Sequence, residues 1–369
     1  MRYFKSDNTA AVSREILDAL GAANSGTALA YGADRWSEAL NGLFGKFFET
    51  EVRVFAVSSG TAANSLAIAT LCPPWGTVLT HAEAHIERDE CGAPEFFSGG
   101  AKLSLVGGAG AKIAAADLES RLAWFEPHVH GVQPKMLSIT QATERGAVYT
   151  PAEIRALADI AHARGMSVHM DGARFANAVV AQKVSPAELS WKAGVDVLSF
   201  GVIKNGGMNA EAVVFFKPEQ VGDFEFRRKR AGQLACKGRY AAVQISTYLE
   251  TGLWRRPTLL LAILTLAVGL LHGRITAYAA KRQVLCVTES GLSVGGRFFR
   301  RFSATWAAID RIDIADKSAA IVMRDGRTQT FDLIDIRHGN DVTRALARAR
   351  TRLDGVTRTP AGVAEQIQT

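Results

Sequence analysis

The stretch DVLSFGVIKNGGMNAEAVVFF, residues 196–216, places one lysine, Lys204, between two apolar runs. Both runs are typical of buried strands, because they are short, rich in Val and Phe, and separated by a glycine-containing segment. A lysine is unusual there, since its charge favours the surface. The side chain could reach from a strand end to solvent, or its amine could have a lowered pKa and attack a carbonyl group. The glycines behind it, Gly206 and Gly207, are expected to leave room for a bulky ligand.

Helical and strand-like patterns alternate on the N-terminal side of this stretch. Helices are predicted over residues 12–24 and 150–165, and the second opens with the capping-box pattern TPAE. Strands are predicted within residues 53–57, 135–143 and 166–175. Such alternation predicts an α/β fold, with a mostly parallel sheet covered by helices on both faces. Ligands of such sheets collect at the carboxyl ends of the strands.

The composition changes after Trp254, which indicates a second domain of different character. Residues 1–254 hold 25 basic and 26 acidic side chains, whereas residues 255–369 hold 18 basic and 10 acidic ones. An uninterrupted apolar run, PTLLLAILTLAVGLL (257–271), follows the boundary. It is shorter than the roughly 18–20 residues of a membrane-spanning helix, so a buried, an interfacial and a marginal membrane position all stay open.

The rest of the C-terminal region has β-type patterns. QVLCVTESGLSVGG (283–296) fits a hairpin, and AAIVMRDGRTQTFDLIDI (319–336) has Asp-Gly between two alternating runs, a strong hairpin signal. NDVTRALARARTRL (340–353) predicts a closing helix. The predicted organisation is a domain over residues 1–254, an apolar helix at 255–274, a small Arg-rich module of β-hairpin and helix at 275–356, and a flexible tail at 357–369.

A turn of small residues, SSGTAAN (58–64), lies where a predicted strand passes into a helix. Ser59, Gly60 and Thr61 can bring backbone N–H groups and hydroxyls close to an anion, and a helix N-terminus favours negative charge. A phosphate group fits this pattern. An ordinary strand–helix turn is the alternative, and a Walker loop is excluded because its Gly-x-x-x-x-Gly-Lys pattern is absent.

A carboxylate and a guanidinium follow the strand in VHMDGARF (168–175). Asp171 at a strand's carboxyl end can hold a protonated ring nitrogen or a metal ion, and Arg174 can bind a carboxylate through two hydrogen bonds. The alternative is that Asp171 caps a turn and pairs with Arg174.

The three elements together point to one cofactor. A phosphate-binding turn, a strand-end aspartate and a later lysine, in this chain order, are what pyridoxal 5'-phosphate (PLP) requires. The phosphate docks on the helix terminus, the aspartate keeps the pyridine nitrogen protonated, and the lysine forms a Schiff base with the aldehyde. Lys204 thereby gains a reason to lie between two strands.

The same residues stand in a longer series of motifs that resembles the low-specificity threonine aldolases. These are PLP-dependent enzymes of fold-type I within the β-eliminating lyase group. The resemblance covers residues 1–254, about two-thirds of the chain. Its motifs are FKSDN (4–8), YGADRW (31–36), SSGTAAN (58–64), AHIERDECGAPEFFSGGAKL (84–103), ITQATERG (139–146), HMDGARFANA (169–178), SFGVIKNGG (199–207) and RRKRAGQLACKGR (227–239).

The resemblance implies roles toward the cofactor. Lys204 is the expected Schiff-base lysine, Asp171 the partner of the pyridine nitrogen, and His85 the imidazole that stacks on the ring. Contacts to the cofactor phosphate are implied for Ser59, Gly60, Thr61, Arg230 and Lys237.

The resemblance also implies roles toward the substrate. Arg174 and Ser6 are the expected ligands of the amino-acid carboxylate. Tyr31, implied as a substrate-binding residue, and Asp34 lie on a segment that in this family often serves the neighbouring subunit.

The implied reaction is the retro-aldol cleavage of threonine or allo-threonine to glycine and an aldehyde. A base must remove the proton of the β-hydroxyl group, and two candidates stay open. His85 is one of them. Glu144 is the other, at a position where many relatives carry His, and a glutamate there needs a raised pKa or a bridging water.

The resemblance ends near Trp254, where fold-type I enzymes continue into a small domain that supplies another carboxylate-binding arginine. The apolar run and the Arg-rich region replace it here. Two alternatives to the aldolase therefore stay open. One is a different PLP-dependent β-eliminating lyase, and the other is a catalytically impaired aldolase fusion whose tail binds a membrane or a protein partner.

The expected partners are a small amino-acid substrate and further copies of the chain, in a homodimer or homotetramer, with no nucleic acid. No metal is expected, because His128 and His130 share a strand face but lack a third ligand. The four cysteines form no Cys-x-x-Cys pair and the N-terminus has no long apolar stretch, so a cytoplasmic location is predicted. Membrane association through residues 257–271 stays open.

Overall fold

The computed structural model describes residues 6–255, 284–287, 291–296, 299–314 and 318–332. The chain divides into two compact units, residues 1–269 and 270–369. The predicted domain boundary at Trp254 adjoins residues outside these described ranges and stays a prediction. The predicted apolar helix, closing helix and tail lie outside the described residues as well.

The first unit is built on a seven-stranded sheet with the strand order β1-β7-β6-β5-β4-β2-β3. Strand β7 runs antiparallel to β1 and β6, and the other neighbouring pairs are parallel, so the predicted mostly parallel sheet is confirmed. The two apolar runs beside Lys204 are β6 and β7. The strands are β1 Arg53–Val57, β2 Gly76–His81, β3 Lys102–Val106, β4 Gln133–Thr140, β5 Ser167–Gly172, β6 Val197–Phe200 and β7 Glu211–Phe215.

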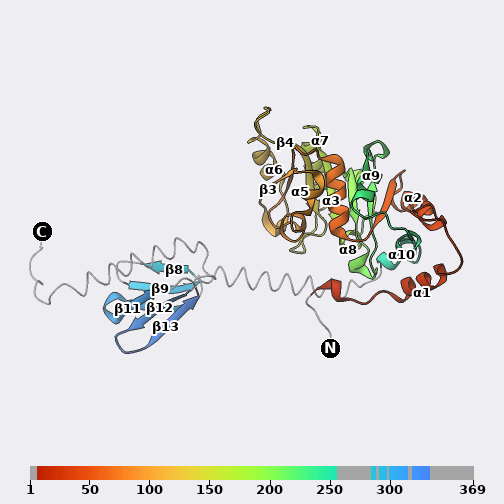
Figure 1. The fold of residues 1–369 in the computed structure, drawn as a ribbon. Coiled ribbons are helices and arrows are strands. Elements are labelled where there is room, and N and C mark those ends of the chain that lie inside the picture. The colour runs from red at the N-terminus through yellow and green to blue at the C-terminus, as the bar shows by residue number, and fades with distance from the viewer. Residues whose placement is uncertain (1–5, 256–283, 288–290, 297–298, 315–317, 333–369) are drawn as a thin grey trace, which may run out of the picture. The chain divides into compact units, whose positions relative to one another are not determined.

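Helices cover both faces of this sheet (Figure 1). Because side chains alternate along a strand, Phe55 and Val213 pack with α3 and α9, whereas Val54 and Val214 pack with α2, α7, α8 and α10. The helices are α1 Arg14–Ala23, α2 Arg35–Phe48, α3 Gly60–Leu71, α4 His85–Arg88, α5 Ala93–Ser98, α6 Ala115–Leu122, α7 Pro151–His162, α8 Phe175–Gln182, α9 Phe224–Arg230 and α10 Arg239–Glu250.

Local signals explain where two of these helices begin. The Thr150 hydroxyl accepts from the backbone N–H of Glu153, whose carboxylate accepts from the Thr150 N–H, so α7 opens with the predicted capping box. The Ser59 hydroxyl accepts from the backbone N–H of Ala62 at the start of α3. The SSGTAAN turn is therefore a capped helix N-terminus that directly follows β1.

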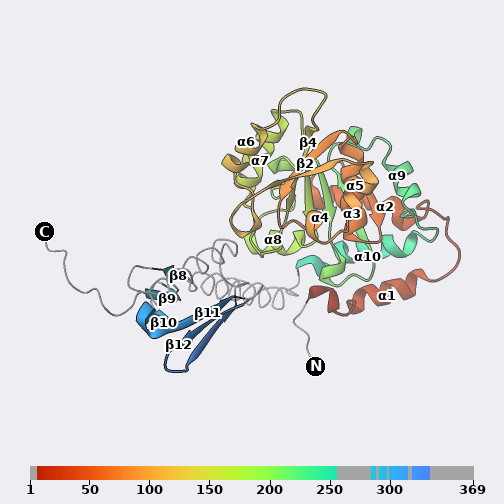
Figure 2. The same ribbon diagram turned by 60° about the vertical axis from the view of Figure 1, so that its left-hand side comes forward.

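Helix α10 packs against α1 and α2, and Figure 2 shows α1 and α10 side by side. Its Tyr248 is fully buried and accepts a hydrogen bond of 2.7 Å from the side-chain amide of Asn205. Asn205 follows Lys204 in a short 3-10 turn, η4 (Ile203–Asn205). The lysine is thus carried by a turn that a core helix holds in place.

The described part of the second unit is antiparallel β structure. Two sheets, β10-β9-β8 and β11-β12-β13, have three strands each. Gly326 has φ +84° in the predicted Asp-Gly turn between β12 and β13, and β8 pairs with β9 as predicted for the other hairpin. Within the described ranges, no helix combines the length and apolar character that crossing a membrane requires. The strands are β8 Val284–Val287, β9 Gly291–Gly296, β10 Phe299–Thr305, β11 Ile309–Ile314, β12 Ser318–Met323 and β13 Thr328–Asp332.

Candidate active site

The residues predicted to carry the chemistry meet at the carboxyl edge of the sheet. Asp171 lies at the end of β5, directly opposite Ser199 of β6, and β6 leads into the turn of Lys204. His85 begins α4, which follows β2. The charges of both Asp171 and Lys204 act on the His85 ring. The parallel strand order therefore assembles these three residues from distant segments of the chain.

Asp171 is buried and held by two donors. Its Oδ2 accepts a hydrogen bond of 2.9 Å from the Asn64 amide, and its Oδ1 accepts one of 3.0 Å from the backbone N–H of Ala173. A carboxylate has about four acceptor positions, so Asp171 can still bind a protonated ring nitrogen. Among the described residues Arg174 pairs with Asp7 and not with Asp171, whereas the bond from the Ala173 N–H is the turn cap of the alternative interpretation.

A second buried carboxylate, Glu90, joins this network. Its Oε1 accepts from the same Asn64 amide group at 2.8 Å and lies 2.8 Å from Nδ1 of His85. The bond to Glu90 raises the pKa of His85, against the opposing effect of burial. His85, Glu90 and Asp171 offer ligand atoms within 4.8 Å of one another, a spacing that a metal ion could use. The Asn64 amide donates a hydrogen bond to both carboxylates, and the absence of metal stays a prediction.

Glu144 contacts the main chain of His85. Its Oε1 accepts a hydrogen bond of 2.7 Å from the His85 backbone N–H. Its Oε2 is buried and has no hydrogen-bond partner within the described part of the chain. Burial raises the pKa of this carboxyl group. The raised pKa that a glutamate base requires at this position is therefore present.

Lys204 stands on a turn that a buried acid anchors. Glu211, on β7, accepts hydrogen bonds from the backbone N–H groups of Val202 at 2.9 Å and Ile203 at 3.2 Å, just before the lysine. Burial raises the pKa of Glu211 to about 8, and the nearby charge of Lys204 opposes that rise.

The expected role of the glycines behind the lysine is wrong. Gly206 has φ +105°, and a Cβ added there would lie 2.1 Å from the hydroxyl oxygen of Ser13. A Cβ on Gly207 would lie 3.0 Å from the backbone of Val202. Both glycines permit close approach of the protein's own chain, rather than room for a ligand.

The predicted carboxylate ligand Arg174 already bonds a carboxylate of the protein. Its Nε and Nη2 donate to Asp7 at 2.6 and 3.0 Å. Ser6 precedes Asp7, and its hydroxyl accepts from the backbone N–H of Asn8. Asp7 is therefore next to Ser6 in sequence and in hydrogen-bond contact with Arg174. The structure thus brings Ser6 and Arg174 close together.

The predicted phosphate turn has free donors. Gly60 and Thr61 are the first two residues of α3, and no described residue accepts a hydrogen bond from their backbone N–H groups. A Cβ added to Gly60 would meet nothing within 4 Å. Ser58 beside them donates to the Gln233 side chain through both its N–H and its hydroxyl. An anion can therefore approach the start of the helix.

The other residues with predicted roles make no hydrogen bond to the phosphate turn within the described part of the chain. Arg230 and Lys237 are exposed, and neither has a hydrogen bond to the phosphate turn among the described residues. Gln233 is the residue of this segment that reaches the turn. Tyr31 is 52% exposed, with Lys229 Nζ 4.5 Å from the centre of its ring. Asp34 caps α2 through the Ser37 N–H.

Three residues of the network were not predicted. Asn64 and Glu90 stand inside motifs that the sequence already singled out, and Glu211 begins an apolar run. For Asn64 and Glu211 the available signal is a polar side chain among buried neighbours, because such groups are buried only when they have partners. Glu90 has exposed neighbours on both sides in sequence, so no local signal marks it.

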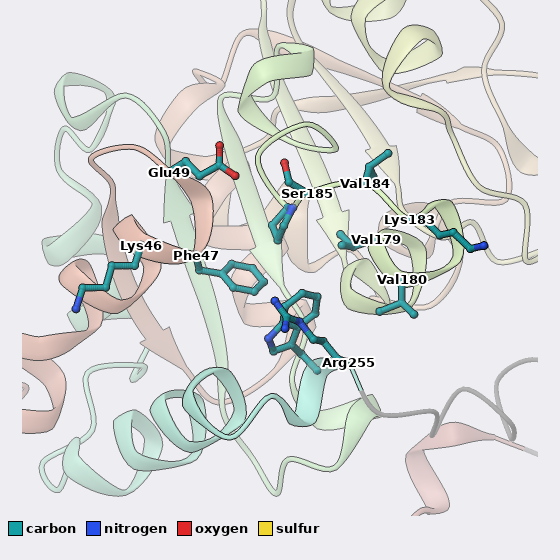
Figure 3. Close-up of a pocket in the computed structure, with 11 residues that line it drawn as sticks. Lys46, Phe47, Glu49, Val179, Val180, Lys183, Val184, Ser185 and Arg255 are labelled. Carbon is teal, nitrogen blue, oxygen red and sulfur yellow. The ribbon is translucent and has the colours of Figure 1, made fainter.

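A cavity of about 510 Å³ lies away from this site, between α2, α8 and the turn η6 (Leu253–Arg255). Figure 3 shows Phe47 and Arg255 directed toward its centre, whereas Lys46 and Lys183 point away. None of the predicted site residues lines it. The chemistry therefore belongs to the carboxyl edge of the sheet and not to this cavity.

The donor set at the sheet edge fits PLP. The free N–H groups of α3 suit its phosphate, the buried Asp171 suits its ring nitrogen, and Lys204 suits its aldehyde. An α/β fold with these groups in this order defines a PLP-dependent enzyme of fold-type I. The sequence matches the beta-eliminating lyase family over residues 3–358, and the chain belongs to that family.

Individual relatives agree with this assignment. Low specificity L-threonine aldolases of Pseudomonas sp. (strain NCIMB 10558) and Pseudomonas aeruginosa are 44% and 45% identical to it over 253 residues, which are 69% of this chain and 73% of each relative. A threonine aldolase structure from Leishmania major matches with a TM-score of 0.64 at 21% identity. It covers 95% of this chain and 99% of the other, and this likeness supports the fold. The protein is a PLP-dependent lyase.

Proposed function

We propose that this protein cleaves β-hydroxy-α-amino acids, threonine or allo-threonine, to glycine and an aldehyde. The observation that carries the proposal is the grouping of Lys204, Asp171 and His85 at one sheet edge, each at its position in the motif series. The identity to threonine aldolases from two Pseudomonas sources supports this substrate class.

Four groups of the chain hold the cofactor in this proposal. Lys204 binds it covalently, and Glu211 holds the turn that carries this lysine through two backbone hydrogen bonds. Asp171 holds the ring nitrogen, oriented by the Asn64 amide and the Ala173 N–H. The start of α3, at Ser59, Gly60 and Thr61, holds the phosphate, and His85 lies against the ring face. When bound, PLP supplies the electron sink that stabilises the carbanion left by carbon–carbon cleavage.

Glu144 is the group we favour for the β-hydroxyl proton. It has a buried oxygen, Oε2, with no partner among the described residues, and burial raises its pKa. His85, the other candidate, is assigned in this proposal to the ring face, with its Nδ1 bonded to Glu90. Arg174, with Ser6 beside it, binds the substrate carboxylate through the N–H groups that Asp7 does not use.

In this proposal Tyr31 contributes to the site of a neighbouring copy and Arg230 contacts the cofactor phosphate. Both do so only in an assembled oligomer. Both are exposed in the single chain, which suits a contribution across a subunit interface. We propose a homodimer or homotetramer located in the cytoplasm. Measurement of the molar mass in solution tests the oligomer.

A spectrum and a product assay test the proposed function. Protein loaded with PLP is expected to show the visible band of a lysine–PLP adduct, and Lys204→Ala is expected to lack it. Incubation with threonine should then release acetaldehyde and glycine in equal amounts. Release of a keto acid and ammonia instead would assign the alternative β-elimination, and the absence of a band in PLP-supplemented protein would contradict both.

A further inference from the structure

Glu90 is a fully buried carboxylate side chain for which the proposed reaction has no role so far. It lies between α4 and α5 and contacts residues from two other parts of the fold. Oε1 meets Nδ1 of His85 at 2.8 Å and the Asn64 amide at 2.8 Å, and the same amide meets Asp171 at 2.9 Å. One chain of hydrogen bonds therefore runs from His85 through Glu90 and Asn64 to Asp171.

We propose that Glu90 is a positioning residue that orients the His85 ring and ties it, through Asn64, to Asp171. The inference deepens the proposed function and rests on it, because His85 and Asp171 are the two residues expected to contact the cofactor ring. A shift of one of them is transmitted to the other through the Asn64 amide, whose nitrogen donates to both carboxylates.

The contact decides which ring nitrogen of His85 carries the proton. A carboxylate can only accept, so the bond at Nδ1 requires a proton on Nδ1. In the neutral ring, Nε2 is then the unprotonated nitrogen. A hydrogen bond at one ring nitrogen sets the tautomer and orientation in other histidine sites by the same reasoning. The backbone of His85 is anchored as well, because its N–H donates a hydrogen bond to Glu144.

Other charged groups act on His85 as well. Asp171 favours the protonated ring and Lys204 disfavours it, while Glu144 lies against the backbone. Glu90 has the largest effect of these, because it makes the direct bond. Its second oxygen, Oε2, has no partner in the described part of the chain. The two donors at Oε1 are therefore what compensates the burial of this carboxylate.

Glu90→Gln tests the proposal, with Glu87→Gln, an exposed glutamate of α4, as the matched control. The measurement is ¹⁵N NMR of histidine-labelled, cofactor-free protein across pH, with the His85 signals identified by their loss in His85→Gln. In Glu90→Gln, the pKa of His85 is expected to fall by about one unit or more, a tenfold change in proton affinity. The share of the neutral ring protonated at Nδ1 should fall too. Glu87→Gln should match the unmodified protein.

Unchanged His85 titration and tautomer in folded Glu90→Gln would overturn the proposal. If Glu90→Gln does not fold, Glu90→Asp takes its place, because it keeps the charge but shortens the reach to Nδ1. A His85 pKa below that of the unmodified protein then supports the proposal, and an unchanged His85 pKa overturns it. These spectra need no cofactor. Absence of aldolase activity in the unmodified protein would therefore contradict the proposed function, but it would not change the outcome of the NMR measurement.

Discussion

Arg174 and Asp7 form an ion pair through two parallel hydrogen bonds, Nε to Oδ2 at 2.6 Å and Nη2 to Oδ1 at 3.0 Å. Both side chains are partly buried, at 33% and 25% exposure. The pair ties the short turn η1 (Asp7–Thr9) to the N-terminus of α8, where Arg174 is the N-cap residue. It also means that the guanidinium expected to bind the substrate carboxylate shares its positive charge with a carboxylate of the protein.

Replacing Arg174 by Gln is expected to raise KM for threonine by roughly 10- to 100-fold, because a charge-assisted contact contributes about 1.5–3 kcal/mol. Steady-state kinetics with a coupled aldehyde assay measure this. Arg14→Gln, at an exposed helix position paired with Asp18, is the matched control and should leave KM unchanged. A normal KM in Arg174→Gln would contradict the assigned role.

Replacing Asp7 by Asn is expected to lower KM by a few-fold. The amide oxygen can still accept from Arg174, while the negative charge that competes with the substrate carboxylate is gone. The same assay reports it. A higher KM would instead mean that the charge of Asp7 is needed to hold the guanidinium in position.

Glu144→Gln is expected to lower kcat by roughly 10²- to 10⁴-fold with little change in KM, as for the loss of a general base. The glutamine oxygen can still accept from the His85 N–H, so the structural contact is kept. In the unmodified protein, kcat should rise with pH through a pKa above the ordinary 4.5 of Glu, since burial raises the pKa of Glu144. Glu83→Gln, at a partly exposed position paired with Arg145, is the control. A loss of only a few-fold in Glu144→Gln would return the role of base to His85.

Glu211 predicts how the stability of the cofactor-free protein depends on pH. Burial raises its pKa to about 8, from an ordinary value of 4.5. Between these values the folded protein binds more protons than the unfolded chain, so this residue makes the free energy of unfolding fall as pH rises. Glu211→Gln should flatten the decline between pH 5 and pH 8, measured by urea denaturation. Glu119→Gln, an exposed control, should not. Equal slopes in all three proteins would contradict the prediction.

Gly201→Ala is expected to weaken both the fold and the site. An added Cβ would lie 2.3 Å from the carbonyl oxygen of Ala173, whose N–H holds Asp171. Overpacking of this kind costs about 1–3 kcal/mol, and the displaced loop should bind PLP less tightly. Thermal melting and a PLP titration measure the two effects. Gly21→Ala, at an open helix position, should be neutral or stabilising. Normal PLP affinity in Gly201→Ala would show that this loop does not contribute to cofactor binding.

Much of the architecture follows from local sequence. The capping box at Thr150 and Glu153, the strands on either side of Lys204 and the Asp-Gly hairpin are short-range patterns, and the structure contains each of them. The glycines after Lys204 depart from the sequence-based expectation for a physical reason. A glycine at such a position indicates that a side chain is not tolerated. Only the fold decides whether a ligand or other atoms of the protein fill the space.

The sequence by itself determined the order of the motifs, the α/β class and the cofactor, because each depends on residue types and their spacing along the chain. Only the tertiary structure decided the partners: Asp7 for Arg174, Glu90 for His85, Asn64 for Asp171, and Glu211 for the turn of Lys204. These contacts join separate elements. They depend on strand register and helix packing, which no local pattern encodes, and burial makes each of them necessary because a polar group removed from water must find a partner.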